Sequence, residues 1–266
     1  MPVQMSLASP VANEVFMHTS VNPAPGLVNT NAAQSFMCWL SAPTAVWTTT
    51  NQIASMVGAY TGTYNASTNP TTGLQIGTQQ DGGSGVMVWS WGGVVLVSTS
   101  TGGNGVITPF TPSNNTWVHV AYTCTAISGT TQTHSLYVNG VLMAHSTNAL
   151  QVAGALTQIY INGYPQVPPV TSTQTSNTAV DDIRFYNRAL SAAEISTIYN
   201  TMGAADGIVY GLVAYYTFDE GVVGQPFTMA LDISAQNNTL VTQNNSSTPM
   251  TYIAGVTGNN LRRPQV

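Results

Sequence analysis

Charge is what this sequence has least of. Only 5% of the 266 residues are charged, and the positive charge comes from four arginines with no lysine. Nucleic-acid-binding proteins neutralise phosphates with clustered basic side chains. Arg184, Arg188, Arg262 and Arg263 form no basic tract, so we predict no nucleic-acid partner. Disorder accompanies low hydrophobicity and high net charge. Here 43% of residues are hydrophobic and the mean hydropathy is +0.09, which predicts a sizeable core under a neutral polar surface.

Long apolar runs and cysteines are also scarce. No run approaches the roughly 18 residues that span a bilayer, so no membrane partner is predicted. The N-terminal segment has neither a basic start nor an apolar centre, so we predict no signal peptide. Cys38 and Cys124 leave room for one disulfide at most. Each lies in an apolar, strand-like run, which favours two buried free thiols over a bridge.

The residues that catalysis would need are few and badly placed. A glycosidase uses two carboxylates that face each other across a cleft. The adjacent acids Asp181 and Asp182 would point to opposite faces of a strand, and Asp219 and Glu220 likewise. The four histidines lack metal-binding spacing, and His119 is expected to be buried with one hydrogen bond. We therefore predict that the chain is not an enzyme.

Strand signals, in contrast, recur along the whole chain. Short β-branched and aromatic runs alternate with clusters of Gly, Pro, Asn and Ser, a pattern typical of all-β proteins. Asn139-Gly140 is the strongest hairpin signal, because both residues tolerate the positive φ of a two-residue turn. The predicted strands are Glu14–His18, Ser35–Leu40, Gln52–Ala59, Leu74–Thr78, Val86–Trp91, Val94–Ser98, Trp117–Cys124, His134–Val138, Val141–His145, Gln158–Asn162, Val180–Asn187, Val213–Phe218 and Asn238–Thr242.

One short helix is expected near residues 191–202. Ser191 and Glu194 have the spacing of a capping box, in which each side chain satisfies a free backbone amide of the other. Leu190 is placed to pack on Ile195 as a hydrophobic staple. The helix is expected to end at Gly203, a residue suited to the left-handed conformation that closes helices.

Three segments in order resemble the laminin-G-like and pentraxin-like domains of the concanavalin A-like class. They are Ser35–Leu40, the pair formed by Trp117–Thr123 and Ser135–Gly140, and Val180–Ile195. The last is specific, because the similarity runs over sixteen consecutive positions. The resemblance implies an all-β, two-sheet antiparallel jelly-roll sandwich.

The order of the resembling segments looks circularly permuted. Leu212–Gly221 resembles the first strand of the family, which normally opens the domain, and Ala230–Leu240 resembles the stretch that follows it. We therefore predict a main body over residues 1–206 and a C-terminal segment, 207–266, that carries the opening strands. This segment would complete its own sandwich, which is favoured, or that of a neighbour by domain swapping.

Calcium is the one cofactor left open. Pentraxin-like relatives bind it with residues after an early strand, where Asp81 lies here, and with an acidic loop whose counterpart in this chain has no carboxylate. Calcium takes six to eight oxygen ligands. A structural ion held by Asp182 and Asp219 is the remaining prediction, against the favoured alternative that both side chains bind loop amides.

Sugar binding would use exposed aromatic rings beside polar side chains. Tyr60 and Tyr64 lie at the loop 61–73, and Tyr164 opens the proline-containing loop 164–178. These three tyrosines are the predicted contacts to a glycan or a protein partner. Trp89 and Trp91 share a strand face and are expected in the core.

Two functions remain. The first is a virion structural protein, such as a bacteriophage capsid decoration (cement) protein or fibre component, located at the particle surface. Its partners would be capsid proteins, further copies of itself and a host-surface glycan. The alternative is a secreted or cell-surface carbohydrate-binding module, which the resemblance supports by analogy only.

Overall fold

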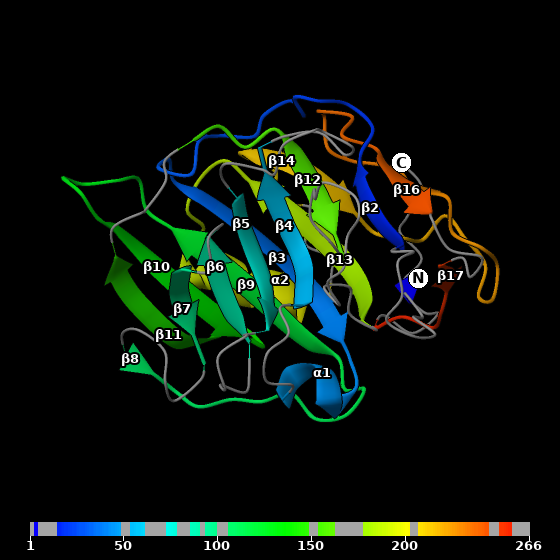
Figure 1. Cartoon of the computed structure of the whole chain (residues 1–266), viewed down its shortest axis with the longest axis horizontal. Helices are drawn as coiled ribbons and strands as arrows, with labels where there is room; N and C mark the ends of the chain where they lie inside the picture. Colours follow the sequence, from blue (N-terminus) through cyan, green and yellow to red (C-terminus); the bar gives the residue numbers. More distant parts are fainter. Residues whose placement is uncertain are drawn as a thin grey trace.

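The structure is a computed structural model that describes residues 3–4, 15–48, 54–61, 73–78, 86–90, 94–99, 106–148, 154–162, 178–202, 207–244 and 250–256. Within these residues the chain forms two antiparallel sheets that pack face to face, as Figure 1 shows. The predicted all-β jelly-roll sandwich is confirmed.

The two sheets have a simple order in the described residues. The nine-stranded sheet A runs in the order β17 (Thr251–Tyr252), β1 (Val3–Gln4), β13 (Ala179–Tyr186), β3 (Gln34–Ser41), β9 (Val118–Cys124), β10 (Gln132–Val138), β11 (Val141–Asn148) and β8 (Val106–Ile107), with β14 (Leu212–Tyr216) also paired to β13. The eight-stranded sheet B runs in the order β15 (Met229–Ala230), β16 (Leu240–Asn244), β2 (Val15–Thr19), β12 (Gln158–Ile161), β4 (Ala54–Tyr60), β5 (Gly73–Thr78), β6 (Met87–Ser90) and β7 (Val94–Ser98).

The main core lies between the sheets. Phe36 on β3 packs against Tyr122 on β9 and Phe185 on β13, with ring centroids 4.9 and 5.5 Å away. The neighbouring residue Met37 points to the other face of sheet A and joins a second apolar cluster beneath the helix α2 (Ala192–Asn200). Because both faces of β3 are covered, all eight of its residues are buried. This explains why its centre, Phe36–Leu40, is continuously apolar rather than alternating.

The helix α2 begins as the sequence predicts. The Ser191 hydroxyl accepts a hydrogen bond from the Glu194 amide (3.3 Å), and Glu194 Oε2 accepts one from the Ser191 amide (2.8 Å). Leu190 and Ile195 are buried in the same cluster, as the staple requires. The predicted cap at Gly203 lies outside the described residues, and Met202, just before it, adopts the left-handed conformation with φ of 47°.

A second helix, α1 (Thr44–Thr48), was not predicted. It is only five residues long, and it buries Trp47, whose indole N–H donates to the Ala42 carbonyl at 3.2 Å. In the part of the chain that the structure describes, no helix is long and apolar enough to cross a bilayer.

The predicted hairpin at Asn139-Gly140 is confirmed. Val138 pairs with Val141, and the two turn residues have φ of 51° and 77°. Both positive values fit a type I′ turn. Close packing adds a second reason for glycine, because a Cβ atom at Gly140 would lie 2.9 Å from the ring of Tyr199 on α2.

The C-terminal segment contributes to both sheets of its own chain. The strand β14 pairs with β13, and β16 pairs with β2. The Asp232 carboxylate organises the turn between β15 and β16 by accepting hydrogen bonds from the amides of Tyr215 (2.9 Å), Ser234 (2.8 Å) and Asn238 (2.7 Å). The division at residue 206, the permuted order and the alternative of completing a neighbour's sandwich stay predictions.

The predicted free thiols are confirmed: Cys38 and Cys124 are both buried and unpaired. Burial raises the pKa of both thiols above the ordinary value, and that of Cys38 well above it. Only the thiolate is a good nucleophile. Neither cysteine is therefore a candidate for chemistry.

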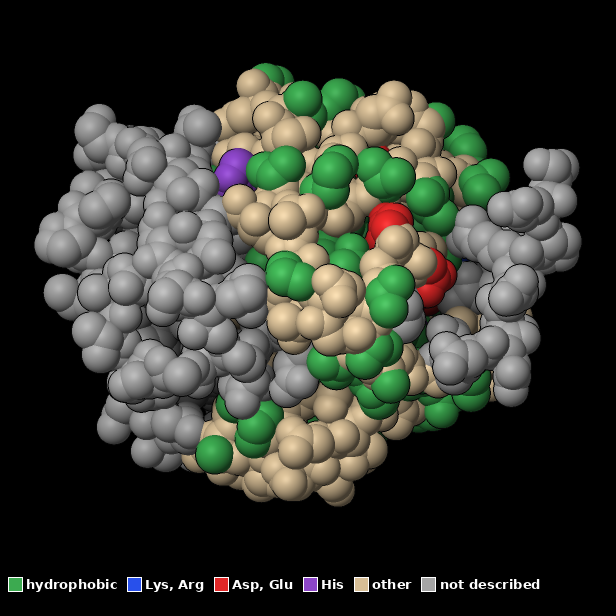
Figure 2. Space-filling view, turned by 90° about the vertical axis from the view of Figure 1, so that its right-hand side faces the viewer, with side chains coloured by type: hydrophobic (Ala, Val, Ile, Leu, Met, Phe, Trp, Pro, Cys, Tyr) green, Lys and Arg blue, Asp and Glu red, His purple; other side chains and the backbone are tan. Residues whose placement is uncertain are grey.

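The surface near the C-terminal strands is poor in charge. Figure 2 looks at this side and shows hydrophobic side chains as separate groups among uncharged polar surface, with carboxylates at a few places. Scattered apolar side chains of this kind are normal on a soluble protein. The exposed apolar residues of this stretch are Val222, Val223, Met229, Leu231 and Ile233.

Candidate functional site

The predicted aromatic contacts do not form a site in the described residues. Tyr64 and Tyr164 lie outside them. Tyr60 is fully buried at the end of β4, with its ring 5.6 Å from that of Tyr160. It pairs across the sheet with Gly73, and the absence of a side chain there lets the Tyr60 ring lie against the glycine. The prediction that Tyr60 is an exposed contact is therefore wrong.

Of the predicted calcium ligands, Asp182 is paired with Arg184, Asp219 is exposed in the turn after β14, and Asp81 lies outside the described residues. Asp181 and Asp182 sit at a β-bulge of β13, where Asp182 has φ of 46°. The Asp182 carboxylate accepts hydrogen bonds from Arg184 Nε (3.0 Å) and from its terminal nitrogen (3.4 Å). A calcium ion there would have to displace this buried ion pair.

No group of three or more His, Cys, Asp or Glu side chains is placed to hold a metal among the described residues. A calcium site at Asp182 and Asp219 stays a prediction, and it would compete with the Asp182–Arg184 ion pair. A site that uses Asp81 stays a prediction too, because Asp81 lies outside the described residues.

Sequence reasoning missed the most unusual carboxyl group, that of Asp181. It is 4% exposed and accepts hydrogen bonds from the amides of Asp182 (2.9 Å) and Val256 (3.4 Å). Burial raises its pKa to about 7, and the nearby charges of Asp182 and Asp219 act in the same direction. A carboxyl group with such a pKa can act as a general acid. Here it is sealed from solvent, so a polymeric substrate does not reach it.

His119 is buried as predicted, but the predicted hydrogen bond is absent. It is 0% exposed, and within the described residues neither ring nitrogen has a partner. The indole nitrogen of Trp39, whose ring centroid lies 5.4 Å away, is unpaired in the same way. Burial, with the nearby charge of Arg184, lowers the pKa of His119 to about 3. The side chain is therefore neutral at physiological pH and serves packing.

We expect His119→Leu to raise the free energy of unfolding by about 2 kcal/mol. The substitution removes two buried polar atoms without partners, each costing about 1–3 kcal/mol, and it loses ring contacts to Trp39 and Tyr199, each worth about 0.5–1.5 kcal/mol. Urea unfolding at pH 7 measures the change. His134→Leu is the matched control, because His134 is equally buried but its Nδ1 bonds the Tyr122 hydroxyl at 2.8 Å. If both variants lose stability equally, the account of His119 fails.

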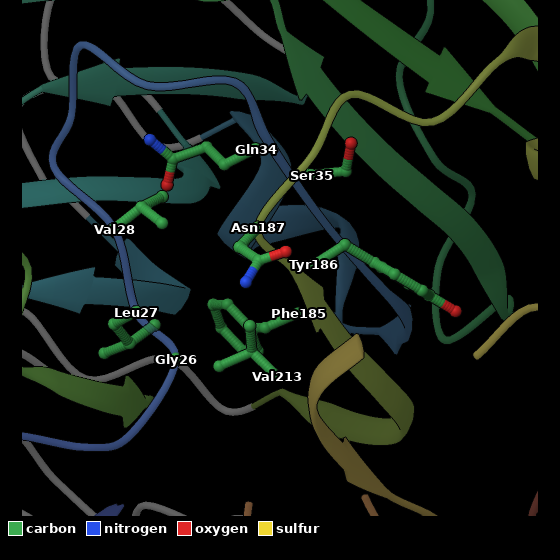
Figure 3. A pocket seen from close by; sticks show the side chains of 9 residues that line it. All are labelled: Gly26, Leu27, Val28, Gln34, Ser35, Phe185, Tyr186, Asn187 and Val213. Carbon is green, nitrogen blue, oxygen red and sulfur yellow. The ribbon is translucent and has the colours of Figure 1, made fainter. Parts of the chain in front are cut away.

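A small pocket opens at one end of the sandwich, between the loop 26–28 and the ends of β3 and β13. Figure 3 shows the Asn187 amide pointing into it. The remaining volume is about enough for one water molecule, so a sugar ring does not fit. The lining residues are Gly26, Leu27, Val28, Gln34, Ser35, Phe185, Tyr186, Asn187 and Val213.

Tyr210 is the one exposed aromatic residue among the Phe, Trp and Tyr side chains that the structure describes, at 81% exposure. It sits at the corner of a turn closed by a 3.0 Å hydrogen bond from the Leu212 amide to the Val209 carbonyl. Gly211 follows with φ of 75°, which a type II turn requires at that position. The backbone N–H of Asn187 donates to the Gly211 carbonyl at 2.9 Å, and this bond fixes the turn to the end of β13.

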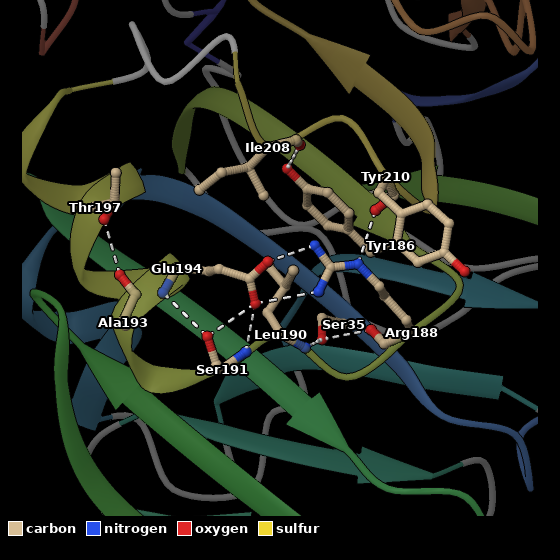
Figure 4. Close-up of polar contacts among 10 residues, drawn as sticks. All are labelled: Ser35, Tyr186, Arg188, Leu190, Ser191, Ala193, Glu194, Thr197, Ile208 and Tyr210. Atoms are coloured by element: carbon tan, nitrogen blue, oxygen red, sulfur yellow. Dashed lines mark hydrogen bonds and ion pairs between the residues drawn. The ribbon is translucent and has the colours of Figure 1, made fainter.

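Arg188 holds the Tyr210 turn against the start of α2 (Figure 4). Its Nε donates to the Tyr210 carbonyl at 2.7 Å, and its two terminal nitrogens donate to Glu194 at 3.1 and 2.6 Å. The guanidinium carbon lies 5.6 Å from the Tyr210 ring centroid and 5.7 Å from that of Tyr186. Hydrogen bonding by Arg188 lowers the pKa of Glu194 to about 2. We call Tyr210, Arg188 and Glu194 the Tyr210 surface.

Sequence reasoning did not find the Tyr210 surface. It assigned Glu194 to the helix cap, which is correct, and had no reason to place Arg188 on the same carboxylate. The one available signal was Tyr210-Gly211 between the helix and the next strand, because a large apolar residue before a turn glycine is exposed more often than one inside a strand. The surface offers a ring face and hydrogen-bonding groups, and no nucleophile or free general base.

Comparisons with known proteins agree with the sandwich. The structure is similar to the heptameric SAP-like pentraxin of Limulus polyphemus, with a TM-score of 0.51, 12% identity, and coverage of 92% of this chain and 94% of that one. It is also similar to a putative carbohydrate-binding protein of Bacteroides ovatus, with a TM-score of 0.54, 15% identity, and coverage of 93% of this chain and 60% of that one. These identities show the fold alone.

The family itself is shown by sequence. No curated protein matches the chain. A family model described as the concanavalin A-like lectin/glucanases superfamily matches residues 18–196, which include the segments on which the resemblance was based. The match ends before residue 207, so it does not test the permuted order of the C-terminal segment. The chain belongs to the concanavalin A-like lectin and glucanase superfamily.

Proposed function

We propose that the chain is a non-catalytic carbohydrate-binding module, and that the Tyr210 surface contacts the sugar. The observation that carries this proposal is a tyrosine ring, 81% exposed, held beside a guanidinium–carboxylate pair. An exposed aromatic side chain of this kind marks a contact surface more often than an isolated aliphatic one does.

The chemistry of the surface suits a sugar. One face of a pyranose ring presents C–H groups that pack on an aromatic ring, and its rim presents hydroxyls that both donate and accept hydrogen bonds. A guanidinium carries five N–H donors. Arg188 uses three of them in its bonds to Tyr210 and Glu194, which leaves two for hydroxyl oxygens. Glu194 Oε1 accepts only from Arg188, so it can accept from a hydroxyl as well.

The surface is also preorganised. Arg188 is held by three hydrogen bonds, and Glu194 accepts further bonds from the amide and hydroxyl of Ser191. Binding therefore orders few side chains, and each immobilised side chain that is avoided saves roughly 0.5–1.5 kcal/mol. A ligand that covers the Tyr210 ring and reaches the Arg188 guanidinium would gain both the ring packing and the hydrogen bonds that this surface offers.

Binding is favoured over hydrolysis for a structural reason. A glycosidase needs two accessible carboxyl groups roughly 5–10 Å apart. In the described residues, Asp181, Asp182 and Asp232 are buried, Glu194 is committed to Arg188 and to the helix cap, and Glu220 accepts from the Leu231 amide, which leaves Asp219 as the remaining exposed carboxyl group. The Bacteroides ovatus protein, named as a putative carbohydrate-binding protein, has the same fold and supports the binding proposal over the virion one.

The virion structural role predicted from the nearly chargeless sequence stays a prediction, as does the choice between a virion and a secreted location. Co-purification with particles at a fixed ratio to a major capsid protein would support the virion role. Recovery of the protein without particles, from the culture medium or the cell surface, would support the secreted one.

We expect Tyr210→Ala to weaken binding about fivefold to thirtyfold for glycans that the full chain selects on a glycan array. The substitution removes the packing face, and a ring contact of this kind is worth about 1–2 kcal/mol. Titration calorimetry on the best array ligand measures the affinity.

Two controls locate the effect. Tyr210→Phe keeps the ring and should retain affinity within about threefold. Val222→Ala truncates a residue that is 66% exposed and outside the site, and should change nothing. An unchanged affinity in Tyr210→Ala would place the sugar elsewhere, whereas an array with no bound glycan would refute the proposed function itself.

A further inference from the structure

The described surface offers no uncompensated positive charge to an acidic ligand. Of the four arginines in the chain, two lie in the described residues. Arg184 is 1% exposed and is paired with Asp182. Arg188 is partly exposed, and its guanidinium is paired with Glu194 at 2.6 Å. The net charge of the whole chain is −5, so the long-range field also opposes anions.

The Arg188–Glu194 pair is strong for a partly exposed one. Two parallel N–H···O bonds, at 3.1 and 2.6 Å, give it the bidentate geometry that arginine and carboxylate prefer. The pKa of Glu194 is lowered to about 2 and that of Arg188 is raised, each mainly by the hydrogen bonds between them. The pair therefore keeps both charges, and no net charge, from about pH 3 upward.

An acidic sugar could have Arg188 as its own countercharge only by displacing Glu194, because on the two spare N–H donors its carboxylate would share the guanidinium with Glu194 and be repelled by it. That displacement would also break the bonds from the Ser191 amide and hydroxyl to Glu194 Oε2, both 2.8 Å. These bonds form the capping box of α2, so the helix start would lose its cap. A capping interaction is worth about 1 kcal/mol. A neutral sugar requires no such displacement, because its hydroxyls use the two spare N–H donors and the spare lone pair of Oε1.

We propose that the Tyr210 surface selects neutral glycans and discriminates against uronates and other acidic sugars. The inference rests on the proposed function, and it names the ligand class of the same site. A carboxylate on the ligand meets the paired guanidinium and the repelling charge of Glu194 together. The expected preference is about threefold to tenfold for a neutral sugar over its carboxylate counterpart, the size of one partly screened charge interaction.

Matched probes test the preference directly. We would measure the binding of the full chain to methyl galactoside and methyl galacturonide, and to methyl glucoside and methyl glucuronide, by saturation-transfer NMR and titration at pH 7. Each pair differs only at C6. The neutral member should bind more tightly, and its affinity should change by less than about twofold between 50 and 500 mM NaCl. Tighter binding of the uronides, lost at high salt, would overturn the inference.

The variant Glu194→Gln tests the cause. Glutamine can still accept the hydrogen bonds of the capping box, and both residues are common at this position. It removes the charge that neutralises Arg188, so the ratio of uronide affinity to neutral-sugar affinity should rise about threefold to tenfold. A melting temperature within a few degrees of the parent confirms an intact helix. An unchanged ratio of neutral to acidic affinity would show that the ion pair does not set the preference.

The two proposals fail in different ways. If neither member of either pair binds, and the glycan array is empty as well, the proposed function is wrong. If sugars bind and lose affinity in Tyr210→Ala, but the uronides bind as tightly as the neutral sugars, the function stands and the inference is wrong.

Discussion

Replacing Arg184 with alanine is expected to lower the free energy of unfolding by about 3–5 kcal/mol, the range measured when one partner of a buried ion pair is removed. Arg184 is 1% exposed on β13 and bonds the Asp182 carboxylate (3.0 Å) and the Tyr215 hydroxyl (2.7 Å). Its guanidinium carbon also lies 4.0 Å from the Tyr215 ring centroid. The variant leaves a buried carboxylate without its countercharge, and it leaves a cavity as large as the lost side chain.

Urea unfolding at pH 7, monitored by tryptophan fluorescence, measures the loss. Arg188→Ala is the matched control, because Arg188 has the same type of pair on the surface, with 22% of its side chain exposed. We expect that control to lose no more than about 1 kcal/mol.

A second variant separates charge from volume. Arg184→Met combined with Asp182→Asn removes both charges and keeps most of the volume, so it should recover much of the stability lost in Arg184→Ala. A loss below about 1 kcal/mol in Arg184→Ala, or no recovery in the double variant, would show that the pair does not anchor β13 and β14.

The strands that could be predicted from the sequence are those whose own residues indicate a strand, without reference to distant parts of the chain. Ser35–Leu40 is found as β3 (Gln34–Ser41), whose apolar run defines a strand alone, and Val180–Asn187 is found as β13 (Ala179–Tyr186), where Ile183, Phe185 and the β-branched Val180 favour a strand. The hairpin at Asn139-Gly140 depends on two consecutive residues that accept positive φ. The helix α2 depends on a four-residue capping box.

The missed elements depend on partners far away in the chain. The strands β1, β8, β15 and β17 have two residues each and exist only through their pairing. For example, β1 lies between β13 and β17. A two-residue strand has no periodicity to detect, and the helix α1, at five residues, is too short to show a helical repeat.

The site residues were harder to predict than the fold, because exposure is a tertiary property. Tyr60 borders a polar loop in sequence, yet its pairing with Gly73 gives its ring a buried place. Tyr210 is exposed because a turn anchored by Asn187 and Arg188 presents it. In neither case do the neighbours in sequence decide the outcome.

Asp181, at the bulge of β13, is expected to lower the free energy of unfolding progressively as the pH rises. The folded-state pKa of Asp181 is about 7 and its ordinary value is 3.8. Between these two values the folded state keeps a proton that the unfolded state has released, so the contribution of this group to the free energy of unfolding falls as the pH rises from about 4 to about 7. The full penalty, present above pH 7, is about 4 kcal/mol.

Asp181→Asn removes this penalty and keeps an oxygen that can accept from the Asp182 amide. The variant is expected to be about 4 kcal/mol more stable than the parent at pH 8, with the difference shrinking towards zero near pH 4. Urea titrations of both proteins at half-unit intervals between pH 4 and pH 8 provide the measurement.

Comparing the two proteins isolates Asp181 from the buried histidines, which act in the opposite direction. The pKa values of His119 and His134 are lowered to about 3 and about 4, mainly by burial. Their neutral forms are favoured in the folded state, so their contribution to stability is complete above pH 6.5 and is lost as the pH falls. It is common to parent and variant and cancels in the difference. A difference that stays constant from pH 4 to pH 8 would mean that Asp181 is already charged at pH 4, and that its carboxylate is solvated or paired rather than held against Asp182 and Asp219.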